Sequence, residues 1–182
     1  GSILHCLKTP PSGGNTGFIN MAAVYQELSD DLKKTVQGLE GIHCVSKLVN
    51  PRVTISENRV NAREFYAKQL EKHPPVQHPL VYEHPETKEM ILFASPRFTI
   101  GIADIPDDEG QSILDELFIY LDRTSAKLEY VWAEGDVVMW DNRSVLHCAM
   151  GGYSYPDIRL INRTTVMCSD ETRLQKVSCA LA

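Results

Sequence analysis

The sequence lacks the features of a membrane or secreted protein. No apolar run approaches the roughly 20 residues that a transmembrane helix needs, and the N-terminus lacks the basic-then-apolar pattern of a signal peptide. Basic residues are also few: 18 Lys and Arg stand against 24 Asp and Glu, for a net charge of -6, whereas nucleic-acid binding depends on clustered basic side chains. We therefore predict a soluble, cytoplasmic protein that has neither nucleic acid nor a membrane as its partner.

Cysteine is sparse and irregularly placed. The five cysteines are an odd number without a Cys-x-x-Cys pair, which indicates free thiols in a reducing compartment rather than a disulfide framework. Three of them directly follow a histidine. Because neighbouring residues on a strand point to opposite faces, such a pair does not direct both side chains to one zinc ion. The five are Cys6, Cys44, Cys148, Cys168 and Cys179.

Short apolar segments separated by turn residues predict a mixed α/β, mainly β, fold. With 182 residues, 43% of them hydrophobic, the chain is long enough for one compact domain, 1–182. Many short strands in mixed order favour a jelly roll, that is, a double-stranded β-helix core with flanking helices. Strands are predicted at 3–7, 16–20, 80–83, 90–93, 98–105, 128–132, 137–140, 146–149 and 159–167, and helices at 21–28, after Ser29 and at 107–121.

The segment 52–72 is polar, charged and weakly periodic. It is interpreted as a solvated helix and loop, and the alternative is a mobile lid or insertion around 50–75 over a site. His73, His78 and His84 each precede proline, which biases the backbone towards extended conformations. We expect turn or surface roles for these three histidines.

Chemistry-bearing residues gather near the C-terminal end, where His147 is followed by Arg159 and Arg163. A neutral imidazole and two guanidinium groups suit a divalent metal ion and an anionic co-substrate. One histidine is not a metal site, because an open Fe(II) site that activates oxygen usually needs two His and one carboxylate. Taken singly, His147 is typical of a core histidine, and the arginines are typical of surface charges.

These residues belong to an ordered set of motifs that spans nearly the whole chain. The set resembles the taurine dioxygenase family, which consists of TauD/TfdA-like oxygenases dependent on Fe(II) and 2-oxoglutarate. Its pieces are TPPSGGNT at 9–16, HPLV at 78–81, HPET at 84–87, Gly135-Asp136, WDNR at 140–143, and His147 with Arg159 and Arg163.

The resemblance implies a role for each matching residue. His147 would be the distal histidine ligand of the iron. Arg159 would bind the distal carboxylate of 2-oxoglutarate, and Thr16 would donate a hydrogen bond to it. Arg163 would face the anionic end of the substrate, whereas Asp141 of the WDNR motif is not a metal ligand in family members.

The activity implied is that of a dioxygenase that hydroxylates or desaturates a small, anionic organic molecule. It would use Fe(II), 2-oxoglutarate and O2 and release succinate and CO2. Relatives also suggest a homo-oligomer.

One family motif is missing from the expected place. The His-x-Asp or His-x-Glu pair precedes the threonine in the family, and none lies between Gly1 and Thr16. The resemblance therefore implies a domain that is N-terminally incomplete, whether as a fragment, as part of a longer molecule or as a chain that evolved without this part. We expect weak Fe(II) binding by the chain alone, an unpaired sheet edge and exposed apolar surface.

Two other functions remain open. A non-catalytic jelly-roll module, or an inactive fragment, would bind an anionic metabolite or a protein partner through Arg159 and Arg163 without a metal. A metal-dependent isomerase or hydrolase of the cupin type would use His5 and His43 together with His147.

Overall fold

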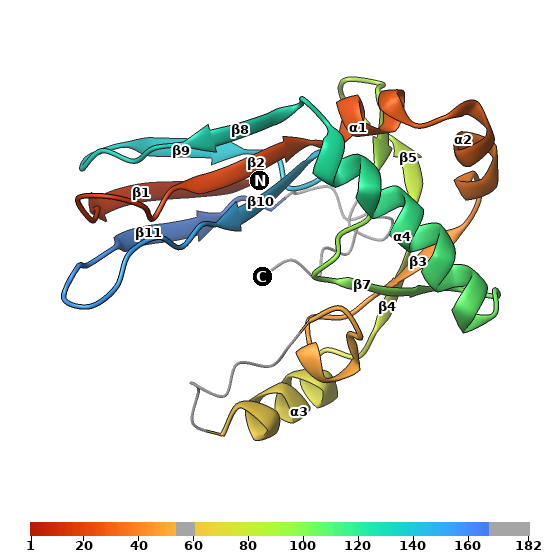
Figure 1. Cartoon of the computed structure of the whole chain (residues 1–182), viewed down its shortest axis with the longest axis horizontal. Helices are drawn as coiled ribbons and strands as arrows, with labels where there is room; N and C mark the ends of the chain where they lie inside the picture. The colour runs from red at the N-terminus through yellow and green to blue at the C-terminus, as the bar shows by residue number, and fades with distance from the viewer. Residues whose placement is uncertain (54–60, 168–182) are drawn as a thin grey trace.

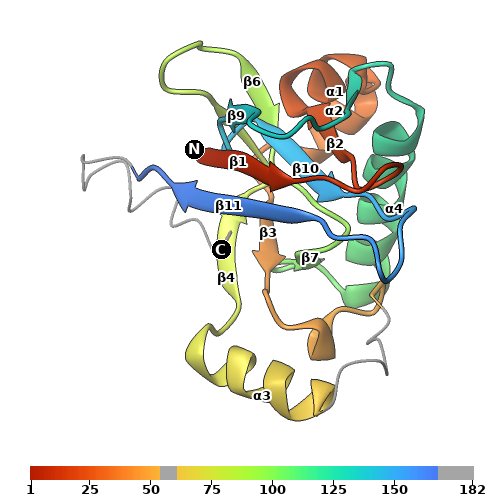
Figure 2. The same ribbon diagram turned by 90° about the vertical axis from the view of Figure 1, so that its left-hand side faces the viewer.

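Strands dominate the architecture, and most helices gather at one end of the strand-rich body (Figures 1 and 2). The computed structural model describes residues 1–53 and 61–167, so Cys168, Cys179 and part of the possible lid lie outside the described residues. Within those ranges the sheets are antiparallel. The predicted mixed α/β, mainly β, class is confirmed.

Two three-stranded sheets, made of segments far apart in the sequence, form the strand-rich body. Phe18 of one sheet and Trp140 of the other meet edge to face, with ring centroids 5.1 Å apart, so the inner faces of the two sheets pack together. One sheet has the order β11 (Leu160–Thr165), β1 (Ser2–Lys8) and β9 (Val137–Trp140), and the other has β10 (Val145–Ala149), β2 (Thr16–Asn20) and β8 (Lys127–Tyr130).

A third sheet and a hairpin connect this body to the helices. The predicted hairpin of 80–83 and 90–93 is confirmed as two short antiparallel strands. The predicted strand 98–105 is shorter in the structure, because pairing with the neighbouring strand ends at Ile102. The elements are β4 (Val76–Pro79), β3 (Glu40–His43) and β7 (Thr99–Ile102) in one sheet, and β5 (Val81–Glu83) with β6 (Met90–Leu92) in the hairpin.

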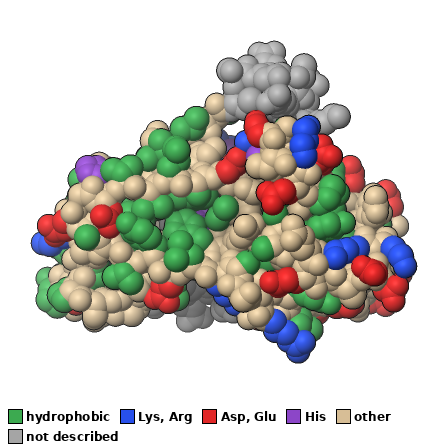
Figure 3. Space-filling view, turned by 90° about the horizontal axis from the view of Figure 1, so that it is seen from above, with side chains coloured by type: hydrophobic (Ala, Val, Ile, Leu, Met, Phe, Trp, Pro, Cys, Tyr) green, Lys and Arg blue, Asp and Glu red, His purple; other side chains and the backbone are tan. Residues whose placement is uncertain are grey.

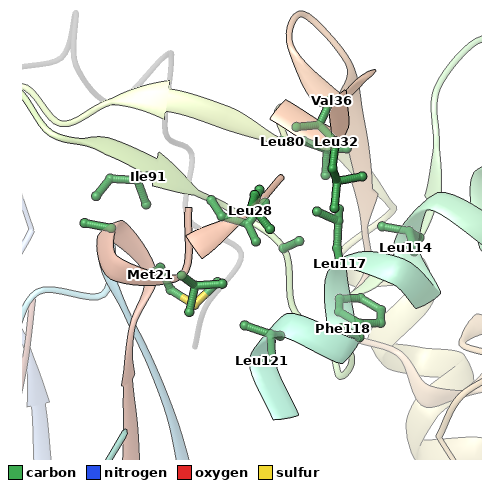
Figure 4. Close-up of a cluster of buried hydrophobic side chains, with 14 of the residues drawn as sticks. Met21, Leu28, Leu32, Val36, Leu80, Ile91, Leu114, Leu117, Phe118 and Leu121 are labelled. Carbon is green, nitrogen blue, oxygen red and sulfur yellow. The ribbon is translucent and has the colours of Figure 1, made fainter. Parts of the chain in front are cut away.

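The main hydrophobic core lies between the hairpin and the helices α1 (Met21–Glu27), α2 (Asp30–Val36) and α4 (Asp107–Arg123) (Figure 4). The predicted helix 107–121 is confirmed as α4, on which Leu114, Leu117 and Leu121 recur at helical spacing and are buried. Ser29 caps α2 by accepting a hydrogen bond from the Leu32 amide at 3.2 Å. The local sequence therefore determines where these helices form, and burial of their apolar sides packs them against one another.

Replacing Leu117 with alanine is expected to lower the free energy of unfolding by about 3 kcal/mol. Leu117 is fully buried in this core, so the substitution removes apolar contacts and leaves a cavity. Ile119 on the same helix is 43% exposed, and its replacement with alanine is expected to cost below about 1 kcal/mol. Urea unfolding of both variants measures the difference, and equal losses would contradict the assigned face of α4.

Segment 52–72 is only partly the solvated region that its polarity predicts. Residues 62–72 form the charged helix α3 (Ala62–Lys72), which lies away from the main core (Figure 1). Arg52, in contrast, has a partner: its side chain is 17% exposed and pairs with Asp115 of α4 at 2.7 Å. The guanidinium also lies over the ring of Phe118, so Arg52 attaches this segment to α4.

The three His-Pro histidines differ in their environments. His73 is exposed at the end of α3, as expected. His84 does form a turn, because its carbonyl accepts from the Lys88 amide at 2.9 Å, but its side chain is buried. His78 is buried within β4. The predicted turn or surface role is therefore confirmed for His73 and His84 but wrong for His78, since proline constrains the backbone and tertiary packing decides burial.

Apolar side chains are exposed over the strand-rich body, as expected. Figure 3 shows hydrophobic side chains gathered on the face above β8 and β9. Val131, which follows β8, and Met139 of β9 are each 70% exposed, and Val137 of β9 is 64% exposed. None of the described helices combines the length and apolar character needed to cross a membrane.

Candidate functional site

Arg159 and Thr16 are brought together although 143 residues separate them in the chain. Thr16 is the first residue of β2 and is 2% exposed, and Arg159 directly precedes β11. The Arg159 Nε donates to the Gly14 carbonyl at 2.6 Å, and its Nη2 donates to Thr16 Oγ1 at 3.2 Å. The Nη1 group makes no hydrogen bond to any described residue, which leaves a guanidinium edge available to an anion.

Gly14 is required at this contact for two reasons. Its φ of +69° lies in the left-handed region, which residues other than glycine rarely adopt. A Cβ at this position would also lie 3.1 Å from the Arg159 Cδ and 3.0 Å from the Pro10 Cγ. The glycine-rich turn therefore makes room for the arginine side chain beside β2.

His147 lies on the same face of its sheet as Thr16. It is directly opposite Phe18 across the β10–β2 pair, and Phe18 and Thr16 point to one face of β2. The ring of His147 lies against Trp140, with centroids 4.7 Å apart, although the residue still reaches solvent. Partial burial and then the positive charge of Arg163 lower the pKa of His147, so a neutral imidazole with a free lone pair is favoured.

Arg163 lies opposite Leu4 on β1, on the face of this sheet that carries Ser2 and Trp140, although the residue as a whole is exposed. Its Nη2 donates to the Ser2 hydroxyl at 3.2 Å, and the Asn142 side-chain amide donates to the same hydroxyl at 2.8 Å. The predicted strand 159–167 is shortened to β11, so Arg159 lies just before the strand and Arg163 lies within it. The structure thus places Arg159 beside Thr16 and Arg163 near His147.

Asp141 is held in an ion-paired network. Its carboxylate lies 2.6 Å from Arg143 Nη2 and 3.3 Å from His84 Nε2. Partial burial disfavours its ionisation, but hydrogen bonds from Arg143 and His84 outweigh this effect and lower the pKa of Asp141 to about 2. Its lone pairs are therefore already engaged by cations and donors of the chain itself.

The sequence also contains a His-x-Glu triplet, His84-Pro85-Glu86, within the HPET segment at 84–87. His84 Nδ1 accepts from the Thr87 amide at 3.2 Å, and Glu86 lies 3.0 Å from Arg143 Nη2. These contacts make the triplet part of the Asp141 network. In residues 1–53 and 61–167, no group of three or more His, Cys, Asp and Glu side chains is placed to hold a metal ion.

A pocket with about 490 Å³ of free space, its open mouth included, separates the third sheet from β10. Two buried polar atoms in its lining, His43 Nε2 and Asn142 Oδ1, have no hydrogen-bond partner among the described residues. Through Asn142 the pocket adjoins the Ser2 hydroxyl that Arg163 also contacts. Its lining includes His43, His78, Phe93, Phe98, Asn142 and Leu146.

His43 is the most strongly perturbed histidine of this pocket. It is 7% exposed, and burial followed by the neighbouring His78 lowers its pKa from 6.5 to about 4. Between pH 4 and pH 6.5 the unfolded chain therefore binds more protons at His43 than the folded chain does. Stability contributed by neutral His43 is present above pH 6.5 and is lost as pH falls towards 4.

The free energy of unfolding is expected to fall between pH 7 and pH 4.5. Replacing His43 with glutamine is expected to make this fall about 2 kcal/mol smaller. Urea unfolding of both proteins at the two pH values measures this difference. His147 remains in the variant and titrates in both proteins, whereas Asp141 titrates well below this range. An unchanged pH dependence would show that His43 is not the group responsible.

Comparisons with known proteins agree with the motifs. The model of the family described as taurine catabolism dioxygenase TauD, TfdA family matches residues 1–165. A relative named alpha-ketoglutarate-dependent 2,4-dichlorophenoxyacetate dioxygenase, from Burkholderia sp. (strain RASC), is 35% identical over 148 residues, which are 80% of this chain and 46% of the relative. An alkylsulfatase from Acinetobacter baylyi is 28% identical, over 91% of this chain and 51% of its own length. The chain thus spans about half the length of these curated relatives.

Solved structures agree with the fold. A taurine dioxygenase from Burkholderia xenovorans superposes with a TM-score of 0.70 at 30% identity, over 89% of this chain and 50% of that one. AAD-2, solved in complex with Mn(II) and N-oxalylglycine, gives a TM-score of 0.76 at 28% identity, over 93% of this chain and 63% of that one. The predicted jelly-roll class is confirmed.

Proposed function

This chain belongs to the taurine catabolism dioxygenase TauD, TfdA family, and we propose that it carries the 2-oxoglutarate site of a dioxygenase that uses Fe(II), 2-oxoglutarate and O2. The observation that carries the proposal is the convergence of Arg159 and Thr16 at one point between the sheets. The reaction proposed is oxidation of a small, anionic organic molecule, by hydroxylation or desaturation, with release of succinate and CO2.

The donor set at Thr16 fits the distal carboxylate of 2-oxoglutarate. A guanidinium fork pairs with a carboxylate through two parallel hydrogen bonds, and a neighbouring hydroxyl satisfies a further lone pair. Arg159 is already fixed by its bond to the Gly14 carbonyl, so little side-chain freedom is lost on binding. We assign Arg159 and Thr16 as the residues that bind the co-substrate.

The fit to a metal ion is partial. His147 offers a neutral imidazole, but the described residues form no complete ligand group around it. We assign His147 as one iron ligand and place no other ligand in this part of the chain. When bound, iron would supply the activation of O2, while the residues described here would hold the co-substrate and the substrate.

Arg163 and the adjoining pocket supply features suited to an anionic organic substrate. Its guanidinium is held towards the interior by the Ser2 hydroxyl, where it can meet a carboxylate or sulfonate. Phe93 and Phe98 give the pocket an apolar lining, and Asn142 connects the two regions. We propose that the anionic end lies at Arg163 and that the apolar part enters this pocket.

The dioxygenase and the non-catalytic binding module are separated by one experiment. The chain is supplied with Fe(II), O2 and 2-oxoglutarate together with an aryloxyacetate, an alkyl sulfate or an alkyl sulfonate, and succinate is measured. Succinate formation that requires both iron and 2-oxoglutarate is expected from a dioxygenase. Binding of 2-oxoglutarate that needs no metal, without succinate, would instead identify a binding module.

The cupin-type alternative receives no support from the geometry. His5 is exposed on β1 and His43 lies in the third sheet against His78 and Phe93. His147 is packed against Trp140 instead. In the described residues these three histidines do not form a ligand group.

A further inference from the structure

We propose that Trp132 is a positioning residue that fixes the Thr16 hydroxyl as a hydrogen-bond donor towards the distal carboxylate of 2-oxoglutarate. The proposal rests on the function assigned above to Thr16 and Arg159. It is based on one buried contact: the Trp132 indole N–H donates to Thr16 Oγ1 at 2.9 Å, and 116 residues separate the two.

The hydrogen-bonding capacity of Thr16 determines where its proton goes. A hydroxyl has one proton to donate and two lone pairs that accept, whereas an indole N–H and a guanidinium can only donate. Trp132 Nε1 and Arg159 Nη2 both lie within hydrogen-bond distance of Thr16 Oγ1, so the hydroxyl accepts from both. Both lone pairs are then occupied, and the proton must point to a third group.

No residue in the described part of the chain accepts that proton. Thr16 is 2% exposed, so a proton without an acceptor at this position is costly. Nη1 of Arg159 also makes no hydrogen bond within residues 1–53 and 61–167, so the geometry points to an anion with several lone pairs as the missing partner. A carboxylate seated on the arginine fork can accept from Nη1 and from the Thr16 hydroxyl at once.

Trp132 is itself held firmly enough to impose this orientation. The side chain is 4% exposed, and its ring meets Tyr130 edge to face, with centroids 5.0 Å apart. The Asp136 carboxylate accepts from the Tyr130 hydroxyl at 3.0 Å and from the Ala133 amide at 2.8 Å. Residues on both sides of Trp132 are thereby tied to one carboxylate in the 134–136 turn.

Loss of the indole N–H leaves one lone pair of Thr16 free. The hydroxyl can then rotate, and its proton is no longer committed to the co-substrate. Replacing Trp132 with phenylalanine, which keeps an aromatic ring, is expected to weaken 2-oxoglutarate binding about 5- to 10-fold, the effect of one neutral hydrogen bond.

A double-mutant cycle separates positioning from a general structural role. Dissociation constants for 2-oxoglutarate are measured by NMR titration for the original chain, Trp132→Phe, Thr16→Val and the double variant. Trp132→Phe is expected to weaken binding only where Thr16 keeps its hydroxyl, and to have no further effect beside Thr16→Val. An equal loss in both backgrounds, or unchanged affinity in Thr16→Val, overturns the proposal.

A second measurement needs no change at Trp132. The chain has two tryptophans, Trp132 and Trp140, so two indole N–H signals are expected in a ¹⁵N–¹H spectrum, and Trp140→Phe identifies which one belongs to Trp132. Adding 2-oxoglutarate should shift the Trp132 signal downfield, because a hydroxyl that donates to an anion becomes a better acceptor. The same shift in Thr16→Val would overturn the proposal.

The failure of this inference is distinguishable from failure of the proposed function. If Arg159→Met leaves 2-oxoglutarate affinity unchanged, the co-substrate site is wrong and the inference falls with it. If Arg159→Met weakens binding while Trp132→Phe does not, the site stands and the role of Trp132 alone is refuted.

Discussion

Replacing Arg159 with methionine is expected to weaken 2-oxoglutarate binding about 100-fold, because the distal carboxylate loses its charged, two-bonded partner. Methionine keeps much of the apolar stem but none of the donors. The free energy of unfolding should fall by no more than about 2 kcal/mol, since the Gly14 carbonyl loses the donor that lies 2.6 Å away. NMR titration with 2-oxoglutarate and urea unfolding of the same protein separate the two effects.

Arg163→Met is the matched control for this experiment. It removes the same charge from the same segment, but Arg163 contacts the Ser2 hydroxyl and not Thr16. We expect the affinity for 2-oxoglutarate to change less than about 5-fold, as for a screened charge outside the contact. An equal loss in both variants would mean that net positive charge, rather than the Arg159 fork, attracts the co-substrate.

Arg159→Lys tests the geometry of the fork further. Lysine keeps the charge but presents it as a compact ammonium that lacks the planar arrangement of donors. Binding intermediate between that of the original chain and that of Arg159→Met is expected. Full affinity in the lysine variant would show that charge alone is sufficient at this position.

Local structure could be predicted wherever its causes are local. Helix α4 follows from Leu114, Leu117 and Leu121 at helical spacing and from acidic residues at its first turn. Strand β2 has the predicted bounds because the glycine-rich turn before Thr16 ends the preceding segment. These patterns span only a few residues, and they do not depend on which helix or strand packs against the segment.

Environments created by the tertiary fold could not be predicted in this way. His78 is in a His-Pro step, which describes its backbone but not the rings of His43 and Phe93 that lie against its own ring. Arg52 has no nearby acidic residue at helical spacing, and its partner Asp115 is 63 residues away. In both cases the neighbouring residue comes from a segment that is distant in the sequence and that only the fold brings close.

In the candidate site, too, some residues could be predicted from sequence motifs and others are found only in the fold. Motif resemblance predicts related roles for Thr16, Arg159, Arg163 and His147, and the structure adds the hydrogen bond that joins Arg159 to Thr16. Trp132 belongs to none of the quoted motifs, yet it contacts Thr16 directly. A single tryptophan after a short strand is typical of a core residue, so only the fold reveals its hydrogen bond.

Replacing His147 with alanine is expected to weaken Mn(II) binding at least 100-fold in the presence of saturating 2-oxoglutarate, since loss of a direct ligand should exceed the effect of losing its supporting contacts. Mn(II) is a suitable probe because it resists oxidation during the titration. Wild-type affinity is expected to be weak, because His147 is the one ligand assigned in the described residues, with the co-substrate supplying further oxygen atoms. Isothermal titration calorimetry measures the change.

His5→Ala and His43→Ala are the controls for this prediction. Both remove an imidazole but neither lies against the His147 and Trp140 pair, so Mn(II) affinity should be retained. Loss of Mn(II) binding in either control would favour the cupin-type ligand set, and retention in His147→Ala would remove His147 from the metal site. Metal-free binding of 2-oxoglutarate should survive in His147→Ala and fail in Arg159→Met, because the imidazole is assigned to the metal and the guanidinium to the carboxylate.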